Sequence, residues 1–293
     1  MERLKVLKTY KVYIGGKFPR TESGRYYTPL NAKGEQLGNI CLCSRKDVRN
    51  SIVAARKGLG GWSERAAFNR GQVLYRIAEM MEGRKEQFIE ELQFQGISKA
   101  KAAKEVDLSI DRLIYYAGWC DKYTQVLGSV NPVASPHFNF SVHEPMGVVG
   151  VLADNSTSLI GLVSIVAPII AGGNTSVVLA SEQLPLCAVT FAEVLNTSDV
   201  PGGVVNILTG KLDEMTKPMA EHMDVNAIVY CGEDMKTVKV LQESAALNMK
   251  RIVHYTDDWL KEGSQDLYKV ADFQEVKTTW HPIENIGGAT STY

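Results

Sequence analysis

The stretch IVYCGEDMKTVKV (residues 228–240) joins a short apolar run to a helix-like segment through a single glycine. Such a turn is typical of α/β proteins, which build phosphate sites there from backbone N–H groups. Further apolar runs occupy residues 147–152, 175–179, 204–208 and 251–255. Each precedes helical or turn-like sequence, and runs that are apolar throughout indicate strands buried on both faces. The pattern predicts an α/β fold with a Rossmann-like, mostly parallel five-stranded sheet covered by helices.

The composition excludes several classes of partner. The 293 residues include 32 basic and 33 acidic side chains, for a net charge of -1. This balance gives no long-range field for nucleic acid or an anionic membrane, so we expect neither. The five cysteines have the spacing of neither a zinc site nor a disulfide framework, which predicts no metal and a cytoplasmic setting. The N-terminus lacks the apolar run of a signal peptide, and the longest apolar stretch, residues 159–171, is too short to span a bilayer.

Helical periodicity dominates the first half of the chain after a few short β-like runs. Ser44 and Asp47 have the spacing of a capping box, which predicts the start of a helix. The sequence GLGG at residues 58–61 predicts the end of that helix before Trp62.

These patterns divide the chain into four parts. We expect an N-terminal arm and helical block, an oligomerisation arm, the Rossmann-like sheet of the same domain, and a C-terminal oligomerisation strand with a polar tail. Their predicted boundaries are residues 1–123, 124–146, 147–260 and 261–293. Met1 and the polar tail are what a complete chain would show.

Six stretches, taken together, carry a family resemblance. They are YIGGKF, YYAGWCDK, EPMGVVGVL, AGGNTSVVLASEQLPL, VPGGVVNILTG and EVKTTWHPI. In this order they resemble the aldehyde dehydrogenase superfamily. The resemblance implies an NAD(P)-binding domain and β-arms for oligomerisation at roughly residues 1–20, 124–146 and 275–283. A complete member has a long catalytic domain between its fifth strand and its terminal strand. Here about twenty residues join the two, which resembles the shortened second domain of the two-domain aldehyde dehydrogenases.

The resemblance implies that no catalytic residue is present. The oxyanion-stabilising asparagine of the family falls on Ser156, with Asn155 one residue away. The general-base glutamate falls on Tyr255, a poor base at neutral pH because a phenol has a pKa of about 10. The two glycines of the same motif become Asp257 and Asp258. The nucleophilic cysteine has no counterpart, because its segment is missing.

The implied cofactor site is partly retained. Glu182 matches an acid that faces the adenosine ribose, Gly210 a glycine near the adenine, and Gly232 the glycine of the pyrophosphate turn. The ribose-gripping lysine falls on Ala180, and the serine of the turn is Glu233. Like charges 4 Å apart repel by about 4 kcal/mol at an effective dielectric of 20. We therefore expect a vestigial site that binds NAD(P) weakly or not at all.

Other interpretations of these residues stay open. Glu233 and Asp234 are also favourable simply as acids in the first turn of a helix, and Glu182 is equally consistent with a helix-start acid. Cys231 at a helix N-terminus, with His254 as its base, would make an improvised nucleophilic pair.

The chain is therefore predicted to be an inactive structural or regulatory subunit. In the family the terminal strand joins the sheet of a neighbouring subunit's catalytic domain. A chain without that domain cannot satisfy this strand in a homodimer of the same design, which favours assembly with a complete aldehyde dehydrogenase. The alternatives are a homo-oligomer, NAD(P)-dependent aldehyde oxidation with catalytic residues supplied in trans, and a nucleotide-sensing module.

Overall fold

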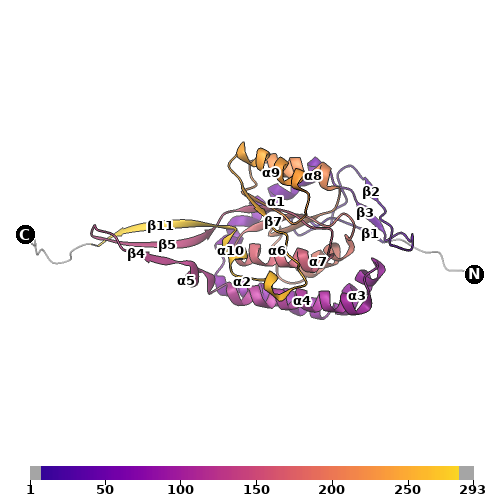
Figure 1. The fold of residues 1–293 in the computed structure, drawn as a ribbon, viewed down its shortest axis with the longest axis horizontal. Coiled ribbons are helices and arrows are strands. Elements are labelled where there is room, and N and C mark those ends of the chain that lie inside the picture. The colour runs from indigo at the N-terminus through magenta and orange to yellow at the C-terminus, as the bar shows by residue number, and fades with distance from the viewer. Residues whose placement is uncertain (1–7, 284–293) are drawn as a thin grey trace, which may run out of the picture.

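A central parallel sheet organises the chain (Figure 1). The computed structural model describes residues 8–283, so the start of the expected N-terminal arm and the polar tail lie outside the described residues. The strands follow the order β10-β9-β6-β7-β8, and every neighbouring pair is parallel. They are β6 (Val148–Leu152), β7 (Thr175–Leu179), β8 (Val205–Leu208), β9 (Ala227–Tyr230) and β10 (Arg251–His254). The predicted five-stranded α/β fold is confirmed.

Helices cover both faces of this sheet, as Figure 1 shows. One face packs against α1 (Arg45–Ser63), α8 (Leu212–Glu221) and α9 (Met235–Ala246). The other packs against α6 (Ile160–Ala171) and α7 (Leu186–Asn196), outside which lie α2 (Ala67–Glu82), α3 (Lys85–Phe94) and α4 (Lys99–Trp119).

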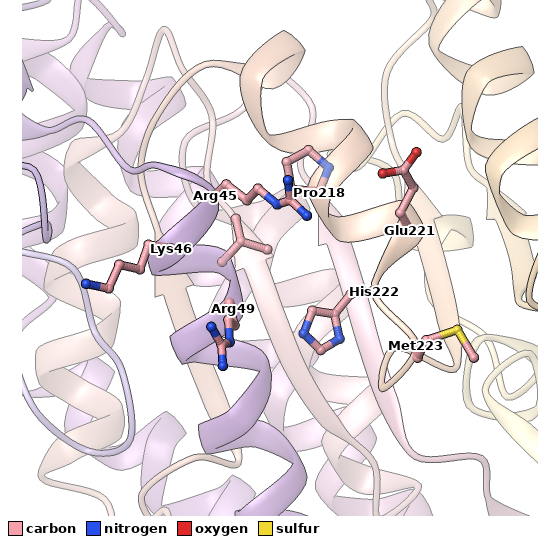
Figure 2. A pocket seen from close by; sticks show the side chains of 8 residues that line it. Arg45, Lys46, Arg49, Pro218, Glu221, His222 and Met223 are labelled. Carbon is pink, nitrogen blue, oxygen red and sulfur yellow. The ribbon is translucent and has the colours of Figure 1, made fainter.

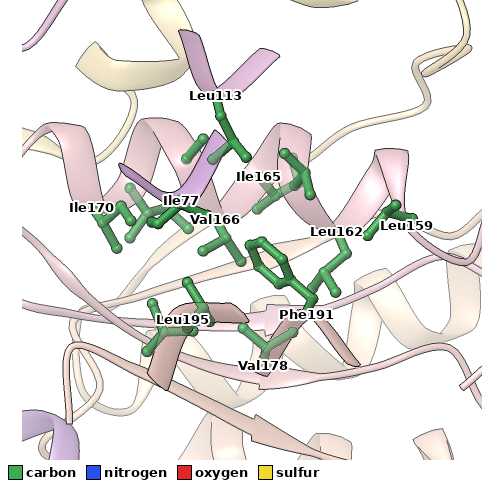
Figure 3. Close-up of a cluster of buried hydrophobic side chains, with 14 of the residues drawn as sticks. Ile77, Leu113, Leu159, Leu162, Ile165, Val166, Ile170, Val178, Phe191 and Leu195 are labelled. Atoms are coloured by element: carbon green, nitrogen blue, oxygen red, sulfur yellow. The ribbon is translucent and has the colours of Figure 1, made fainter. Parts of the chain in front are cut away.

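Helix α6 forms the middle of the larger core. All twelve of its residues are buried, as expected for a helix that is apolar on every side. Figure 3 shows Leu162 and Val166 of α6 among side chains of α2, α4, α7 and β7. Burying such an aliphatic side chain contributes about 1.5–3 kcal/mol. Within residues 8–283, no helix is long and apolar enough to cross a membrane.

Helix α1 begins as predicted and ends later than predicted. The Ser44 amide donates to Asp47 Oδ2 at 2.8 Å, which confirms the capping box. The predicted end at residues 58–61 is wrong, because Trp62 is buried and its indole N–H donates to the Ile170 carbonyl at 2.9 Å. A Cβ at Gly58 would lie 3.1 Å from the Gly203 carbonyl carbon. This glycine permits close packing instead of ending the helix.

A second, antiparallel sheet extends away from the body of the protein (Figure 1). We call it the arm sheet: β4 (Ser129–Asn131), β5 (His137–Pro145) and β11 (Gln274–Pro282), in the order β11-β5-β4, after the short helix α5 (Tyr123–Leu127). β11 pairs with β5 along all nine residues. One edge of the terminal strand is therefore satisfied within its own chain. Its outer edge pairs with no strand within the described residues.

The N-terminal residues that the structure describes lie against the main body. A small sheet contains β1 (Thr9–Tyr10), β2 (Tyr26–Tyr27) and β3 (Asn39–Cys41), and Tyr13 bridges to Ile207 of β8. Tyr13 is buried. This part of the expected N-terminal arm thus forms part of the core and does not join the arm sheet.

Candidate functional site

A cavity of about 490 Å³ opens where β6, β9 and β10 end. The chain continues from β6 to β7 and β8 on one side, whereas β9 lies on the other side of β6. Open parallel sheets bind ligands at this kind of topological switch point. The lining residues are Asp154, Asn155, Ser156, Leu212, Tyr230, Cys231, Gly232, Glu233, Asp234, Thr256 and Asp257.

Four carboxylates face this cavity, which we call the acidic cavity: Asp154, Glu233, Asp234 and Asp257. Within residues 8–283, the lining includes no lysine or arginine. Asp257 pairs with the buried Lys269 behind it, with Nζ 3.1 Å from Oδ2. The acidic character is therefore a property of the whole site and not of Glu233 alone.

Asp234 has a structural role as well. It is the N-cap of α9 and accepts hydrogen bonds from the backbone N–H groups of Lys236 at 3.1 Å and Thr237 at 3.2 Å. The hydrogen bond from the Thr237 hydroxyl and these backbone donors hold the pKa of Asp234 below its usual value. The carboxylate stays ionised and occupies the helix N-terminus that would otherwise attract an anion.

Of the three predicted cofactor residues, Gly232 lines the cavity. Its carbonyl accepts a hydrogen bond from His254 Nε2 at 2.8 Å. A Cβ on Gly232 would lie 2.4 Å from the phenol oxygen of Tyr230, so this turn requires glycine.

The other two predicted residues lie beside the cavity. Glu182 Oε2 accepts from the backbone N–H of Leu212 at 3.4 Å, at the first residue of α8. Its own N–H donates to Asn155 Oδ1 at 3.0 Å, so Glu182 borders the cavity through two lining residues. Gly210 is buried against the backbone of Cys43 and is not part of the lining.

The positions that match the family's catalytic residues are engaged in structural contacts. Ser156, which matches the oxyanion-stabilising asparagine, donates its hydroxyl proton to Asp154 Oδ2 at 2.7 Å. The neighbouring Asn155 accepts at Oδ1 from the Ser181 hydroxyl at 2.9 Å and thereby holds the turn after β7. Tyr255 donates its phenol proton to Asp272 Oδ2 at 2.5 Å. Burial raises the pKa of Tyr255, and Asp272 raises it further. The Tyr255 phenol is thus engaged with Asp272 and is a poor base.

The Cys231–His254 interpretation is not supported. Burial and the nearby Asp154 raise the pKa of the Cys231 thiol, which opposes thiolate formation. The physical reason is that Cys231 directly follows a buried strand, whereas α9 begins only at Met235. His254 donates to the Gly232 carbonyl and stacks on Tyr230.

Trp259 fills the space between the ends of β6 and β10, which the sequence did not reveal. Its side chain is 2% exposed, and its indole N–H donates to Asp154 Oδ2 at 3.0 Å. The ring lies edge-on to Tyr255, with 6.3 Å between centroids. A Cβ at Gly161, in the first turn of α6, would lie 3.0 Å from the indole.

Arg112 holds this connection in place from α4. Its guanidinium donates to the carbonyls of Trp259 at 3.2 Å, Lys261 at 3.0 Å and Ser264 at 3.1 Å, and to the Ser164 hydroxyl at 2.9 Å. The buried face of α4 also carries Glu105 and Ser109, so the sequence pattern did not single out Arg112. Residues 255–273 are thus a packed part of the fold.

Comparisons with known proteins agree with this geometry. The sequence profile of the aldehyde dehydrogenase family matches residues 19–256 and ends two residues after β10. The chain is 32% identical to a putative aldehyde dehydrogenase, DhaS, of Bacillus subtilis over 83% of its length and 50% of that protein. It is 31% identical to the mouse cytosolic 10-formyltetrahydrofolate dehydrogenase, and the aligned region covers 86% of this chain and 29% of that protein.

Solved structures give the same result. The crystal structure of PnpE in complex with nicotinamide adenine dinucleotide superposes with a TM-score of 0.80 and 27% identity, covering 83% of this chain and 50% of that one. The chain thus spans half or less of the length of the relatives it matches. The family profile covers most of the residues from the small N-terminal sheet to the end of the parallel sheet, so the chain belongs to the aldehyde dehydrogenase family.

Proposed function

We propose that this chain is a catalytically inactive aldehyde dehydrogenase family member that assembles with a complete aldehyde dehydrogenase as a structural or regulatory subunit. One observation carries the proposal: residues 255–273 run directly from β10 to β11, where the resemblance implies a catalytic domain. These residues are packed across the end of the sheet by Trp259 and Arg112. This short connection lies between two strands of the described structure, inside the chain.

The chemistry of aldehyde oxidation supports inactivity. The reaction needs a thiolate nucleophile, a donor for the oxyanion and a base that activates water. Cys231 is a buried thiol with a raised pKa. The position that matches the oxyanion asparagine is Ser156, whose hydroxyl donates to Asp154 Oδ2, and Tyr255 is a hydrogen-bonded phenol with a raised pKa.

The acidic cavity also argues against tight dinucleotide binding. PnpE is described in complex with nicotinamide adenine dinucleotide, and this chain has the same fold. A diphosphate in the acidic cavity would face Asp154, Glu233, Asp234 and Asp257. One unpaired like charge 4 Å away repels by about 4 kcal/mol at an effective dielectric of 20, so the net negative charge of the cavity disfavours a diphosphate.

We expect no rise in melting temperature when millimolar NAD or NADH is added to the protein, and no reduction of NAD with an aldehyde. A complete aldehyde dehydrogenase in the same assay serves as the positive control. A melting-temperature rise that disappears in Glu182→Ala would instead favour the nucleotide-sensing module. NAD reduction that appears only after mixing with a second, inactive chain would favour catalysis with residues supplied in trans.

The arm sheet supports assembly. It has three strands, and its outer edges at β4 and β11 pair with no strand in the described part of the chain. It exposes apolar side chains, among them Val276 at 60% and Trp280 at 56%. Unpaired edges beside exposed apolar side chains favour pairing with another chain. A complete family member would offer a sheet that β11 can extend.

We also propose a cytoplasmic location. All five cysteines are buried and none forms a disulfide, as in proteins of reducing compartments. The similar mouse protein is named a cytosolic enzyme.

A further inference from the structure

A hollow of about 650 Å³ lies between the first turns of α1 and the end of α8 (Figure 2). It is separate from the acidic cavity, which meets α8 at its first residue, Leu212. The hollow meets the other end of that helix, from Pro218 to Met223. Its size is within the usual range for small-molecule sites.

Two arginines of α1 line this hollow without a protein partner. Arg45 and Arg49 are one helical turn apart, and within residues 8–283 neither makes a hydrogen bond or an ion pair. Figure 2 shows Arg45 reaching across to Pro218, while Lys46 points to the opposite side. Lys46 is paired there with Glu22.

His222 contributes a hydrogen-bond donor from the α8 side. Its Nδ1 accepts from the Asp224 backbone N–H at 3.2 Å, which leaves the proton of the neutral ring on Nε2. Burial lowers the pKa of His222, so the ring is neutral at neutral pH. Glu221, the one acid in the lining, pairs with Lys217 at 3.6 Å.

The position of the cations is unfavourable for α1 itself. Arg45 and Lys46 occupy the first turn, where the helix dipole favours negative charge. Asp47 is the acid of that turn, and it is engaged in the capping box. An anion bound between Arg45 and Arg49 would interact favourably with both guanidinium groups.

We propose that this hollow binds a small organic phosphate, with the phosphate group between Arg45 and Arg49 and the apolar part against Val48 and Pro218. Guanidinium groups match phosphate oxygens through paired N–H donors, and the Nε2–H of His222 adds a third donor. The proposal is independent of the function proposed above, because it uses neither the acidic cavity nor the arm sheet.

Isothermal titration calorimetry with AMP and with inorganic phosphate tests this site. We expect saturable binding of AMP that is tighter than binding of phosphate, because the nucleoside covers the apolar floor. Arg45→Ala and Arg49→Ala should each weaken AMP binding at least about tenfold, as expected for the loss of hydrogen bonds to a charged group. Arg76→Ala is the matched control, because Arg76 lies on α2 outside the hollow and pairs with Glu79, and this variant should leave binding unchanged.

Two results would overturn the proposal. One is the absence of saturable AMP binding by the folded wild-type protein. The other is an equal loss of affinity in Arg76→Ala and in the Arg45 and Arg49 variants, which would indicate a general attraction to positive charge.

Discussion

Replacing Arg112 with methionine will lower the free energy of unfolding by roughly 3 kcal/mol or more. The guanidinium is 1% exposed and donates to three backbone carbonyls of the connection between β10 and β11. Methionine preserves the apolar stem but provides no donor. Each buried carbonyl left without a partner costs about 1–3 kcal/mol.

Urea unfolding of the two proteins measures this difference. The matched control is Arg76→Met on α2, where Arg76 pairs with Glu79 at 3.0 Å and both side chains are 49% exposed. An exposed pair of this kind contributes about 0.5 kcal/mol or less. If both variants lost the same small amount of unfolding free energy, Arg112 would not be the residue that holds the connection between β10 and β11 in place.

Truncating Trp259 to alanine will cost about 3–5 kcal/mol, the usual range for removing a buried aromatic side chain. The variant leaves a cavity between Tyr255 and the first turn of α6, and it removes the indole donor to Asp154 Oδ2. It also loosens the connection that covers the end of the sheet. We therefore expect faster proteolysis within residues 256–273 as well as a lower urea midpoint.

Trp280→Ala is the control for this prediction. Trp280 lies on the arm sheet and is 56% exposed, so its removal should change the unfolding free energy by less than about 1 kcal/mol. An equally small effect for Trp259→Ala would show that the connection does not pack as described.

The parallel sheet could be predicted from the sequence because its strands are short, apolar throughout and separated by helices. The predicted run at residues 175–179 coincides with β7, and the run at 251–255 exceeds β10 by one residue. The end of α1 could not be predicted in this way. Gly58 and Trp62 depend on contacts with Gly203 and Ile170, which no local pattern reports.

Only part of the acidic cavity could be predicted from the sequence, for a related reason. Glu233 follows its strand by three residues, so the presence of an acid in the turn after β9 could be seen locally. Asp154 and Asp257 join it only because β6 and β10 flank β9 in the sheet. The contact of Arg112 with Trp259 spans 147 residues, and spacing along the chain carries no trace of it.

The pairing of β11 with β5 could not be predicted from local sequence, because β5 lies more than a hundred residues earlier in the chain. The arm sheet satisfies one edge of the terminal strand within the chain and leaves the other edge open in residues 8–283. The argument for a partner therefore rests on that outer edge and on the exposed Val276 and Trp280.

Size-exclusion chromatography with light scattering, on the chain alone and mixed with a complete aldehyde dehydrogenase from the same source, tests the proposed assembly. We predict a stable mixed species whose mass includes both chains, and its loss when residues 275–283 are deleted. The mixed species should remain in Arg76→Met, which alters an exposed side chain of α2. A self-contained homo-oligomer that does not combine with the complete enzyme would contradict the proposal.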